Sequence, residues 1–327
     1  MEEVTATTEQ LITVTSSPPL AAYPMNGIIP VIIIGIIGVI GNGLVLVVLL
    51  LDKKARGNQK NILILNQSLV DLLTSVDFII TYLSRAFVKS YEGAGIWWCW
   101  LVDVEVLMWS IISISTVNLM VITAERYMIV VHPVFYRNHI TKKVMYGLVV
   151  SVWVSNTFIN VIMTYPFAGE FNGICHYAVL MPTIMYYTLY GLFYYFLPVV
   201  MFLMCYPHMI IVIRRRMRVV PMATDRQNQH AMSKKQINLT NVMISVSVVF
   251  IICWSPVSII VFLSLGNAIQ LEDIYAMYLY FSYLSFINTC INPLLYAFQY
   301  NDFKRGFRRL FLEKIDSSGA EPSQPIS

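Results

Sequence analysis

Polar and ionisable side chains recur at membrane depth in this chain. Asp71, Arg126, Asn288 and Asn292 lie in long apolar stretches, where lipid penalises a polar group unless it finds a partner. Ser115 precedes Arg126 by about three helical turns and shares its face, and the two asparagines are one turn apart. If these side chains meet Asp71, they form a cage of hard oxygens suited to a small cation. The alternative is a hydrogen-bonded polar core without an ion.

Signatures of catalysis are missing from the sequence. The five histidines are scattered, the five cysteines include no Cys-x-x-Cys pair, and no metal-ligand spacing occurs. There is no nucleophile elbow, phosphate loop or His-Glu-x-x-His motif. The sequence therefore predicts a protein that is not an enzyme, has no cofactor other than an allosteric cation, and has no nucleic-acid partner.

The elements that would position these residues are membrane helices. With 57% hydrophobic and 12% charged residues, 327 residues cannot pack as a soluble domain without exposing large apolar patches. Sustained two-residue alternation is absent, which favours an all-α bundle over a barrel. Stretches long enough to cross the hydrocarbon core are predicted at 27–51, 61–85, 99–131, 143–166, 182–213, 235–265 and 274–299.

Basic residues gather in one set of connecting segments, namely 52–60, 132–143, 214–235 and 304–314. The positive-inside rule makes these segments cytoplasmic and the N-terminus extracellular. The outer side is acidic, with only Arg85 and Lys89 as basic residues, and would attract a cationic ligand. The inner side would face anionic lipid or an acidic partner, although such charges also serve simply to fix topology. Residues 1–26 have no basic n-region, so they are not expected to be a cleavable signal peptide.

The cysteines divide by this topology. Cys99 and Cys175 share the oxidising side, where a disulfide would tether the second outer loop over the bundle. Cys205, Cys253 and Cys290 lie within spans, where a lone cysteine is usually a small packing residue.

A set of motifs in chain order resembles the rhodopsin-like (class A) G-protein-coupled receptors over all seven spans. They are Gly41-Asn42, Asn66-Gln67-Ser68-Leu69-Val70-Asp71, Glu125-Arg126-Tyr127, Trp153, Pro198, Tyr206, Cys253-Trp254-Ser255-Pro256 and Asn292-Pro293-Leu294-Leu295-Tyr296. Residues 301–312 resemble the amphipathic eighth helix of that family. The resemblance implies sodium as the cation held by Asp71, Ser115, Asn288 and Asn292.

The resemblance also assigns activation roles. Arg126 would be held by Glu125 at rest and passed to Tyr206 and Tyr296 in an active state, since a guanidinium always needs a partner. Many family members have an acid at the position of Gln236, so a weak resting lock and some ligand-independent signalling are expected here.

Movement is expected at two prolines. Pro256 and Pro293 remove helical hydrogen bonds, so a rotation of Trp254 above Phe250 would be amplified at the kink. The alternative for Trp254 is a core-filling role. His132-Pro133-Val134, after Glu125-Arg126-Tyr127, resembles the receptor loop whose apolar residue inserts into the G protein, and the resemblance makes Val134 the candidate.

Ligand contacts are predicted from helix faces in the outer half, at Tyr82, Arg85, Asp103, Glu105, Met108, Trp254, Ser258, Tyr278 and Ser282. Met108 stands where amine receptors usually have an aspartate, which disfavours a monoamine, and Asp77 is a further acid for a cationic group. Asp103 and Glu105 could instead be solvated caps or partners of Arg85. The spacing from Cys99 to Arg126 is longer than is usual in the family, so an irregular turn is expected at the start of the third span.

The sequence thus predicts a plasma-membrane receptor for an extracellular peptide that activates heterotrimeric G proteins through movement of the sixth helix, with arrestin and membrane lipid as further partners. A small non-amine ligand is the runner-up, and a seven-span transporter or channel is the alternative class, although no inverted repeat is visible. The expected divisions are an extracellular tail (1–26), the receptor domain (27–300), the eighth helix (301–313) and a cytoplasmic tail (314–327).

Overall fold

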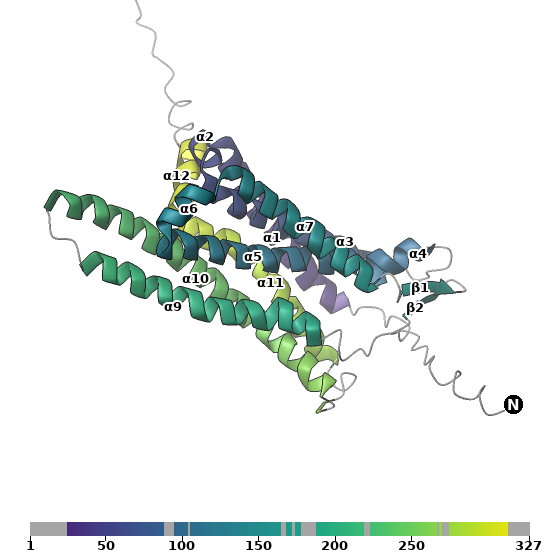
Figure 1. Cartoon of the computed structure of the whole chain (residues 1–327). Coiled ribbons are helices and arrows are strands. Elements are labelled where there is room, and N and C mark those ends of the chain that lie inside the picture. Colours follow the sequence, from purple (N-terminus) through teal and green to yellow (C-terminus); the bar gives the residue numbers. More distant parts are fainter. Residues whose placement is uncertain are drawn as a thin grey trace, which may run out of the picture.

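The computed structural model is a bundle of long helices that run along one another (Figure 1). It describes residues 25–87, 95–103, 105–164, 168–171, 174–177, 188–218, 223–266, 268–269 and 275–312, some of them by their backbone only. The two predicted tails lie outside these residues, apart from the start of the first helix.

Seven helices of the described chain form the bundle, and the predicted all-α fold class is confirmed. They are α1 (Met25–Leu51), α3 (Ile62–Phe87), α5 (Val106–Val131), α7 (Lys142–Thr164), α9 (Leu197–Arg218), α10 (Ala223–Leu265) and α11 (Tyr275–Gln299). Six helical segments of the described part are long and apolar enough to cross a membrane. The seventh helix, α11, is 25 residues long but rich in Tyr, Ser and Asn.

Short elements connect or extend these helices. They are α2 (Lys53–Arg56), η2 (Gln59–Asn61), α4 (Gly95–Trp98), η3 (Cys99–Asp103), α6 (Pro133–His139), β1 (Ala168–Phe171), β2 (Ile174–Tyr177), η4 (Leu192–Phe196), α12 (Asn301–Phe307) and η6 (Arg308–Leu312). Strands β1 and β2 pair antiparallel, with Ala168 opposite Tyr177. This hairpin was not predicted, because two strands of four residues lie below the length at which alternation is visible in a sequence.

Two predicted spans differ in detail. The third is not one continuous helix from 99, because a π-helical turn over Cys99–Asp103 precedes α5 and Glu105 adopts a left-handed backbone with φ of 55°. The expected irregular turn is therefore present. The sixth helix begins at Ala223 rather than 235 and extends, together with α9, beyond the other helices (Figure 1).

Small and amide-bearing residues bring the helices together. A Cβ atom on Gly38 would collide with the side chain of Ser75, so glycine permits the close approach of α1 and α3. Asn42 Nδ2 donates to the backbone oxygen of Thr289 in α11 at 2.9 Å. Trp153 Nε1 in α7 donates to Asn66 Oδ1 in α3 at 2.9 Å. Side-chain donors thus join α1 to α11 and α7 to α3.

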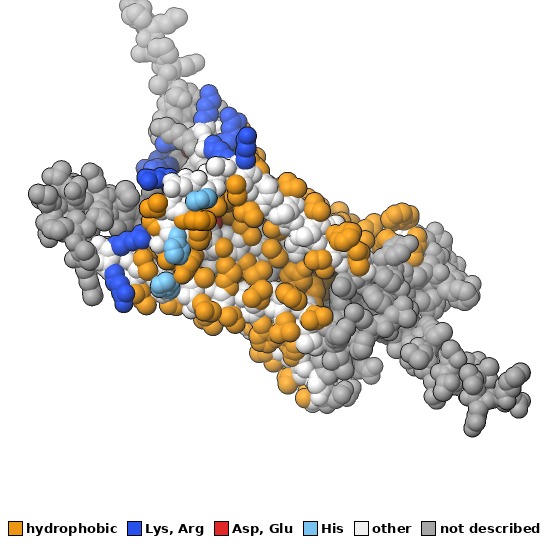
Figure 2. Space-filling view, in the orientation of Figure 1, with side chains coloured by type: hydrophobic (Ala, Val, Ile, Leu, Met, Phe, Trp, Pro, Cys, Tyr) orange, Lys and Arg blue, Asp and Glu red, His pale blue; other side chains and the backbone are white. Residues whose placement is uncertain are grey.

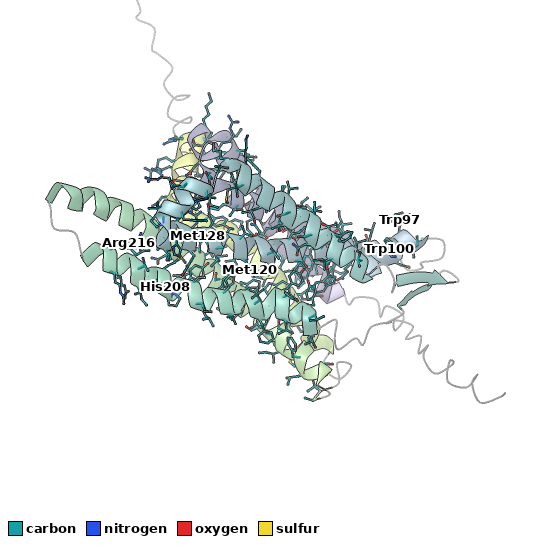
Figure 3. All side chains as sticks on the ribbon, in the orientation of Figure 1. Trp97, Trp100, Met120, Met128, His208 and Arg216 are labelled. Atoms are coloured by element: carbon teal, nitrogen blue, oxygen red, sulfur yellow. The ribbon has the colours of Figure 1, made fainter. Side chains whose placement is uncertain are left out.

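The surface is banded. Figure 2 shows hydrophobic side chains over the middle of the visible face and Lys and Arg side chains gathered at one end. We call this the basic end, where α2, α6 and α12 lie, and the opposite end the hairpin end (Figure 1). Figure 3 places Arg216 near the basic end, and Trp97 and Trp100 beside the hairpin. Exposed apolar residues such as Ile40, at 65% exposure, match a lipid-facing middle.

Candidate functional site

A buried polar cluster surrounds Asp71 at the centre of the bundle. Asp71 Oδ1 accepts hydrogen bonds from Ser115 Oγ at 2.9 Å and Gln67 Nε2 at 3.0 Å, and Oδ2 accepts one from Asn292 Nδ2 at 2.8 Å. Asp71, Gln67 and Asn292 are fully buried. The three donors come from α3, α5 and α11, and they balance a charge that is costly to bury alone. We call Asp71, Gln67, Ser115 and Asn292, together with Asn288 one helical turn before Asn292 in α11, the central cluster.

Two side-chain oxygens of the central cluster accept no hydrogen bond from the described residues. The side-chain oxygens of Asn288 and Asn292, one helical turn apart in α11, are buried and have no hydrogen-bond partner in the described part of the chain. Hard oxygens of carboxylate, hydroxyl and amide type are what a small hard cation prefers. No group of three or more His, Cys, Asp or Glu that could hold a metal occurs in the described part of the chain. A cation here would therefore rely on amide and hydroxyl oxygens beside a single carboxylate.

Glu125 and Arg126 form a buried ion pair near the basic end of α5. Arg126 Nη2 lies 3.5 Å from Glu125 Oε2, and the two side chains are 3% and 2% exposed. Glu125 Oε1 accepts a hydrogen bond from the Tyr136 hydroxyl of α6 at 2.8 Å. Gln59 Nε2 in turn donates to the Tyr136 hydroxyl at 3.2 Å. The ion pair is thus held by α6 and by η2 as well as by its own helix.

Tyr136 is suited to this role by its protonation. Burial and, after it, the negative charge of Glu125 raise the pKa of the Tyr136 phenol above its ordinary value. The hydroxyl therefore keeps its proton and donates it to the carboxylate. Neither Tyr136 nor Gln59 was predicted as a functional residue, because their distance from Glu125 in sequence hides the contact.

The tyrosines predicted to receive Arg126 have other surroundings in this conformation. The Tyr206 hydroxyl lies 2.9 Å from Thr123 Oγ1 and accepts a hydrogen bond from Ser247 Oγ at 3.1 Å. The Tyr296 hydroxyl is fully buried and, within the residues that the structure describes, has no hydrogen-bond partner. Tyr127 instead contacts His208, with its hydroxyl 3.0 Å from Nδ1. Arg126 is therefore paired with Glu125 in this conformation, and the Tyr206 hydroxyl is engaged by Thr123 and Ser247.

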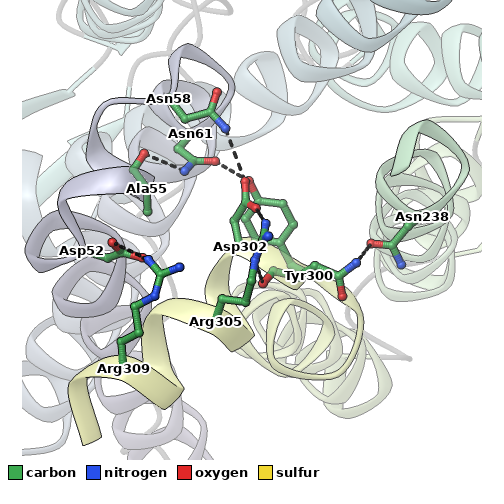
Figure 4. Close-up of polar contacts among 10 residues, drawn as sticks. Asp52, Ala55, Asn58, Asn61, Asn238, Tyr300, Asp302, Arg305 and Arg309 are labelled. Carbon is green, nitrogen blue, oxygen red and sulfur yellow. Dashed lines mark hydrogen bonds and ion pairs between the residues drawn. The ribbon is translucent and has the colours of Figure 1, made fainter. Parts of the chain in front are cut away.

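Neutral side chains join the basic end of α10 to α11 and α12. Ser245 Oγ and the side-chain amide of Gln299 exchange hydrogen bonds at 3.2 Å. Asn301 Nδ2 donates to Asn238 Oδ1 at 3.2 Å (Figure 4). We call these two contacts the α10 latch.

The junction of α11 and α12 is tied to the first connecting segment on its other side. Arg309 Nη1 lies 3.2 Å from Asp52 Oδ2, and Asn58 Nδ2 donates to Asp302 Oδ2 at 3.3 Å (Figure 4). The Tyr300 hydroxyl donates to Asn61 Oδ1. Because α12 and η6 are anchored to the segment 52–61, α12 offers α10 a fixed partner for the latch.

Val134 and the two predicted hinge prolines occupy surrounding positions. Val134 is 63% exposed on α6, two residues before Tyr136, which bonds Glu125. Pro256 lies inside α10 and Pro293 inside α11. An exposed valine is available to a partner at the basic end.

Several predicted ligand residues meet in an aromatic cluster nearer the hairpin end. Tyr82 and Met108 are 5% and 1% exposed, and Trp254 packs against the same cluster. The rings of Phe78 and Phe286 stack with centroids 3.9 Å apart, linking α3 to α11. Trp254 also contacts Phe250 one turn below, at 6.2 Å between ring centroids. Trp254 therefore connects this cluster to the part of α10 that contains Pro256.

The remaining predicted ligand residues come from the start of α5 and from α10 and α11. Glu105 is 9% exposed at the start of α5, while Ser258 and Ser282 are half-buried in α10 and α11. Asp77 Oδ2 is buried and has no hydrogen-bond partner. The side chains of Arg85, Asp103 and Tyr278 lie outside the described residues.

Cys99 is buried and disulfide-bonded. Cys205, Cys253 and Cys290 are free thiols. The side chain of Cys175 lies outside the described residues, although its backbone pairs with Glu170 in the hairpin. Its pairing with Cys99 stays a prediction.

The family follows from the bundle and from comparison with known proteins. Residues 41–296 match the model of the 7 transmembrane receptor (rhodopsin family), so this chain belongs to that family. It is a multi-pass membrane receptor and not an enzyme, as the sequence predicts.

Individual receptors extend the similarity over most of the chain. The chain is 27% identical to the allatostatin-A receptor of Bombyx mori over 85% of its own length and 77% of that receptor. It is 28% identical to somatostatin receptor type 1 of Rattus norvegicus, over 89% of the chain and 73% of the receptor. Human somatostatin receptor type 3 is 27% identical, over 91% and 72% respectively.

Proposed function

We propose that this protein is a plasma-membrane receptor with an extracellular N-terminus, which binds a peptide at the hairpin end and activates heterotrimeric G proteins at the basic end. The observation that supports coupling is the buried Glu125–Arg126 pair, held by Tyr136 on α6. A guanidinium cannot lose its charge on burial, so a new position for Arg126 requires a new partner.

Outward movement of α10 would supply that change. It breaks the α10 latch, whose contacts are neutral and partly exposed, and separates Ser247 from Tyr206. Neutral hydrogen bonds contribute about 0.5–1.5 kcal/mol each, so this side of the resting state is easier to open than the ion pair. Tyr206 and Tyr296 would then receive Arg126, since the Tyr296 hydroxyl is unpartnered at rest.

The test is guanine-nucleotide exchange on a panel of purified G proteins, with receptor membranes and a peptide library. We expect at least one peptide to raise exchange above that of membranes lacking the receptor. The Arg126→Ala variant at matched surface expression is the control and should lose the response. Peptide-independent solute flux together with background exchange would overturn the proposal in favour of a transporter or channel.

A peptide is the ligand class we favour, because the similar receptors are named for allatostatin-A and somatostatin, both peptides. Asp77 is our candidate for a cationic group of the ligand, since its buried carboxylate oxygen Oδ2 has no hydrogen-bond partner among the described residues. Asp77→Asn should lower the affinity for a basic peptide more than the affinity for the same peptide with its basic residue replaced by a neutral one. Equal weakening of both would remove Asp77 from the ligand site.

We also propose an allosteric sodium site at the central cluster. The unpartnered oxygens of Asn288 and Asn292 support it, together with the carboxylate of Asp71 and the hydroxyl of Ser115. A bound cation would supply positive charge that draws α3, α5 and α11 together and favours the resting state. Asp71→Asn should abolish any sodium-specific stabilisation of the purified receptor, and an unchanged sodium effect would exclude this site.

A further inference from the structure

Gln67 directs its amide N–H groups at the oxygens of the proposed cation site. Its Nε2 donates to Asp71 Oδ1 at 3.0 Å and to Ser115 Oγ at 2.6 Å. These are two of the oxygen atoms that would bind a cation, and the positively polarised N–H groups of the amide repel a cation. Entry of a cation therefore competes with donation from Gln67.

The orientation of the Gln67 amide is fixed by side chains from two other helices. Gln67 Oε1 accepts from Asn118 Nδ2 at 2.8 Å, and Asn118 Oδ1 accepts from Asn66 Nδ2 at 2.9 Å. Asn66 Oδ1 accepts from Trp153 Nε1 at 2.9 Å. The result is an unbroken series of hydrogen bonds from α7 to Asp71, which we call the amide relay.

The direction of the amide relay follows from the chemistry of its first member. An indole N–H can only donate, so Asn66 must turn its oxygen towards Trp153 and its amino group towards Asn118. The same requirement passes through Asn118 to Gln67, whose amino group then faces Asp71. Reversing any amide would bring two buried acceptors or two buried donors together, which is costly at zero or near-zero exposure.

We propose that Gln67 is a positioning residue that weakens cation binding at Asp71, and that Trp153 holds it in this role through the amide relay. This inference rests on the proposed sodium site. Trp153 in α7 would then influence the sodium affinity through hydrogen bonds, without contacting Asp71.

The direct test removes the competing donor with Gln67→Leu. Leucine has a similar size, and Asn118 Nδ2 keeps the backbone oxygen of Leu63 as an acceptor at 3.1 Å for one of its two N–H groups. The other N–H loses Gln67 Oε1, a cost that is present with and without sodium and therefore does not change the sodium dependence. Thermal stability of the purified receptor is measured against NaCl, with choline chloride holding the ionic strength constant. We expect the half-saturating sodium concentration to fall about tenfold, the effect of removing one hydrogen bond to a charged group.

The relay is tested with Trp153→Phe, which keeps an aromatic ring and removes the N–H donor together with part of the indole. It should shift the half-saturating sodium concentration in the same direction but by less, because Leu63 still orients Asn118. In the Gln67→Leu background the same substitution should cause no further shift. Thr74→Val is the matched control, since Thr74 is fully buried on α3 but bonds only the backbone oxygen of Val70.

The outcomes distinguish the role of Gln67 from the existence of the cation site. A sodium effect lost in Asp71→Asn but unchanged in Gln67→Leu overturns the role of Gln67 and leaves the cation site standing. Sodium-specific stabilisation absent from every variant, including Gln67→Leu, overturns the cation site and this inference together. A sodium effect seen only after Gln67→Leu supports the inference, because the donor then excludes the cation from the unaltered protein.

Discussion

Replacing Glu125 by Gln should raise signalling in the absence of ligand, because it removes the negative charge that holds Arg126. The two groups lie 3.5 Å apart and are almost completely buried. Coulomb's law with an effective dielectric constant of about 20 gives roughly 5 kcal/mol at that separation. Loss of one partner of a buried ion pair costs about 3–5 kcal/mol in measured cases.

The Glu125–Arg126 attraction affects the balance between resting and active states only in so far as it is present at rest and lost in the active state. If this difference is about 2 kcal/mol, its removal raises the fraction of active receptor roughly thirtyfold, as long as that fraction remains small. The assay is ligand-free guanine-nucleotide exchange on membranes matched for receptor number. Tyr136→Phe is the graded control, because it removes one donor and leaves the charge, so its increase should be smaller. Exchange by Glu125→Gln at the level of the unaltered receptor, with normal surface expression, would refute the resting role of this pair.

Other substitutions test the remaining contacts. Asn301→Ala removes half of the α10 latch and should raise ligand-free exchange by about two- to tenfold, the equivalent of one neutral hydrogen bond; no increase would show that the latch does not restrain α10. Val134→Asp should abolish peptide-stimulated exchange without lowering peptide affinity measured in the absence of G protein, and normal exchange would place the partner elsewhere. Phe78→Ala should lower the melting temperature of the purified receptor more than Leu69→Ala, because Phe78 is 1% exposed and Leu69 40%; equal losses would contradict the aromatic cluster as a packing centre. Trp254→Phe should preserve folding, because the indole N–H has no hydrogen-bond partner, while Trp254→Ala should reduce the maximal peptide response; a full response would argue for a core-filling role.

The pattern of apolar residues along the sequence was sufficient to predict the membrane helices, because lipid imposes a minimum length and an apolar surface on each span separately. The positions of Asp71, Arg126 and Pro256 within those spans could likewise be read directly. The extra length before α5 revealed an irregular turn, although not the left-handed backbone at Glu105. The hairpin was too short to leave a periodic pattern.

Contacts between distant residues required the tertiary structure. Gln67 lies one turn before Asp71, and its polarity was visible, but only the packing of α3, α5 and α7 decides which way its amide points. Tyr136 and Glu125 meet because α6 folds back against α5, which no periodicity reports. The physical reason is the same in both cases. Burial of a side chain is encoded locally by hydropathy, whereas the pairing of one donor with one acceptor depends on which helices are neighbours.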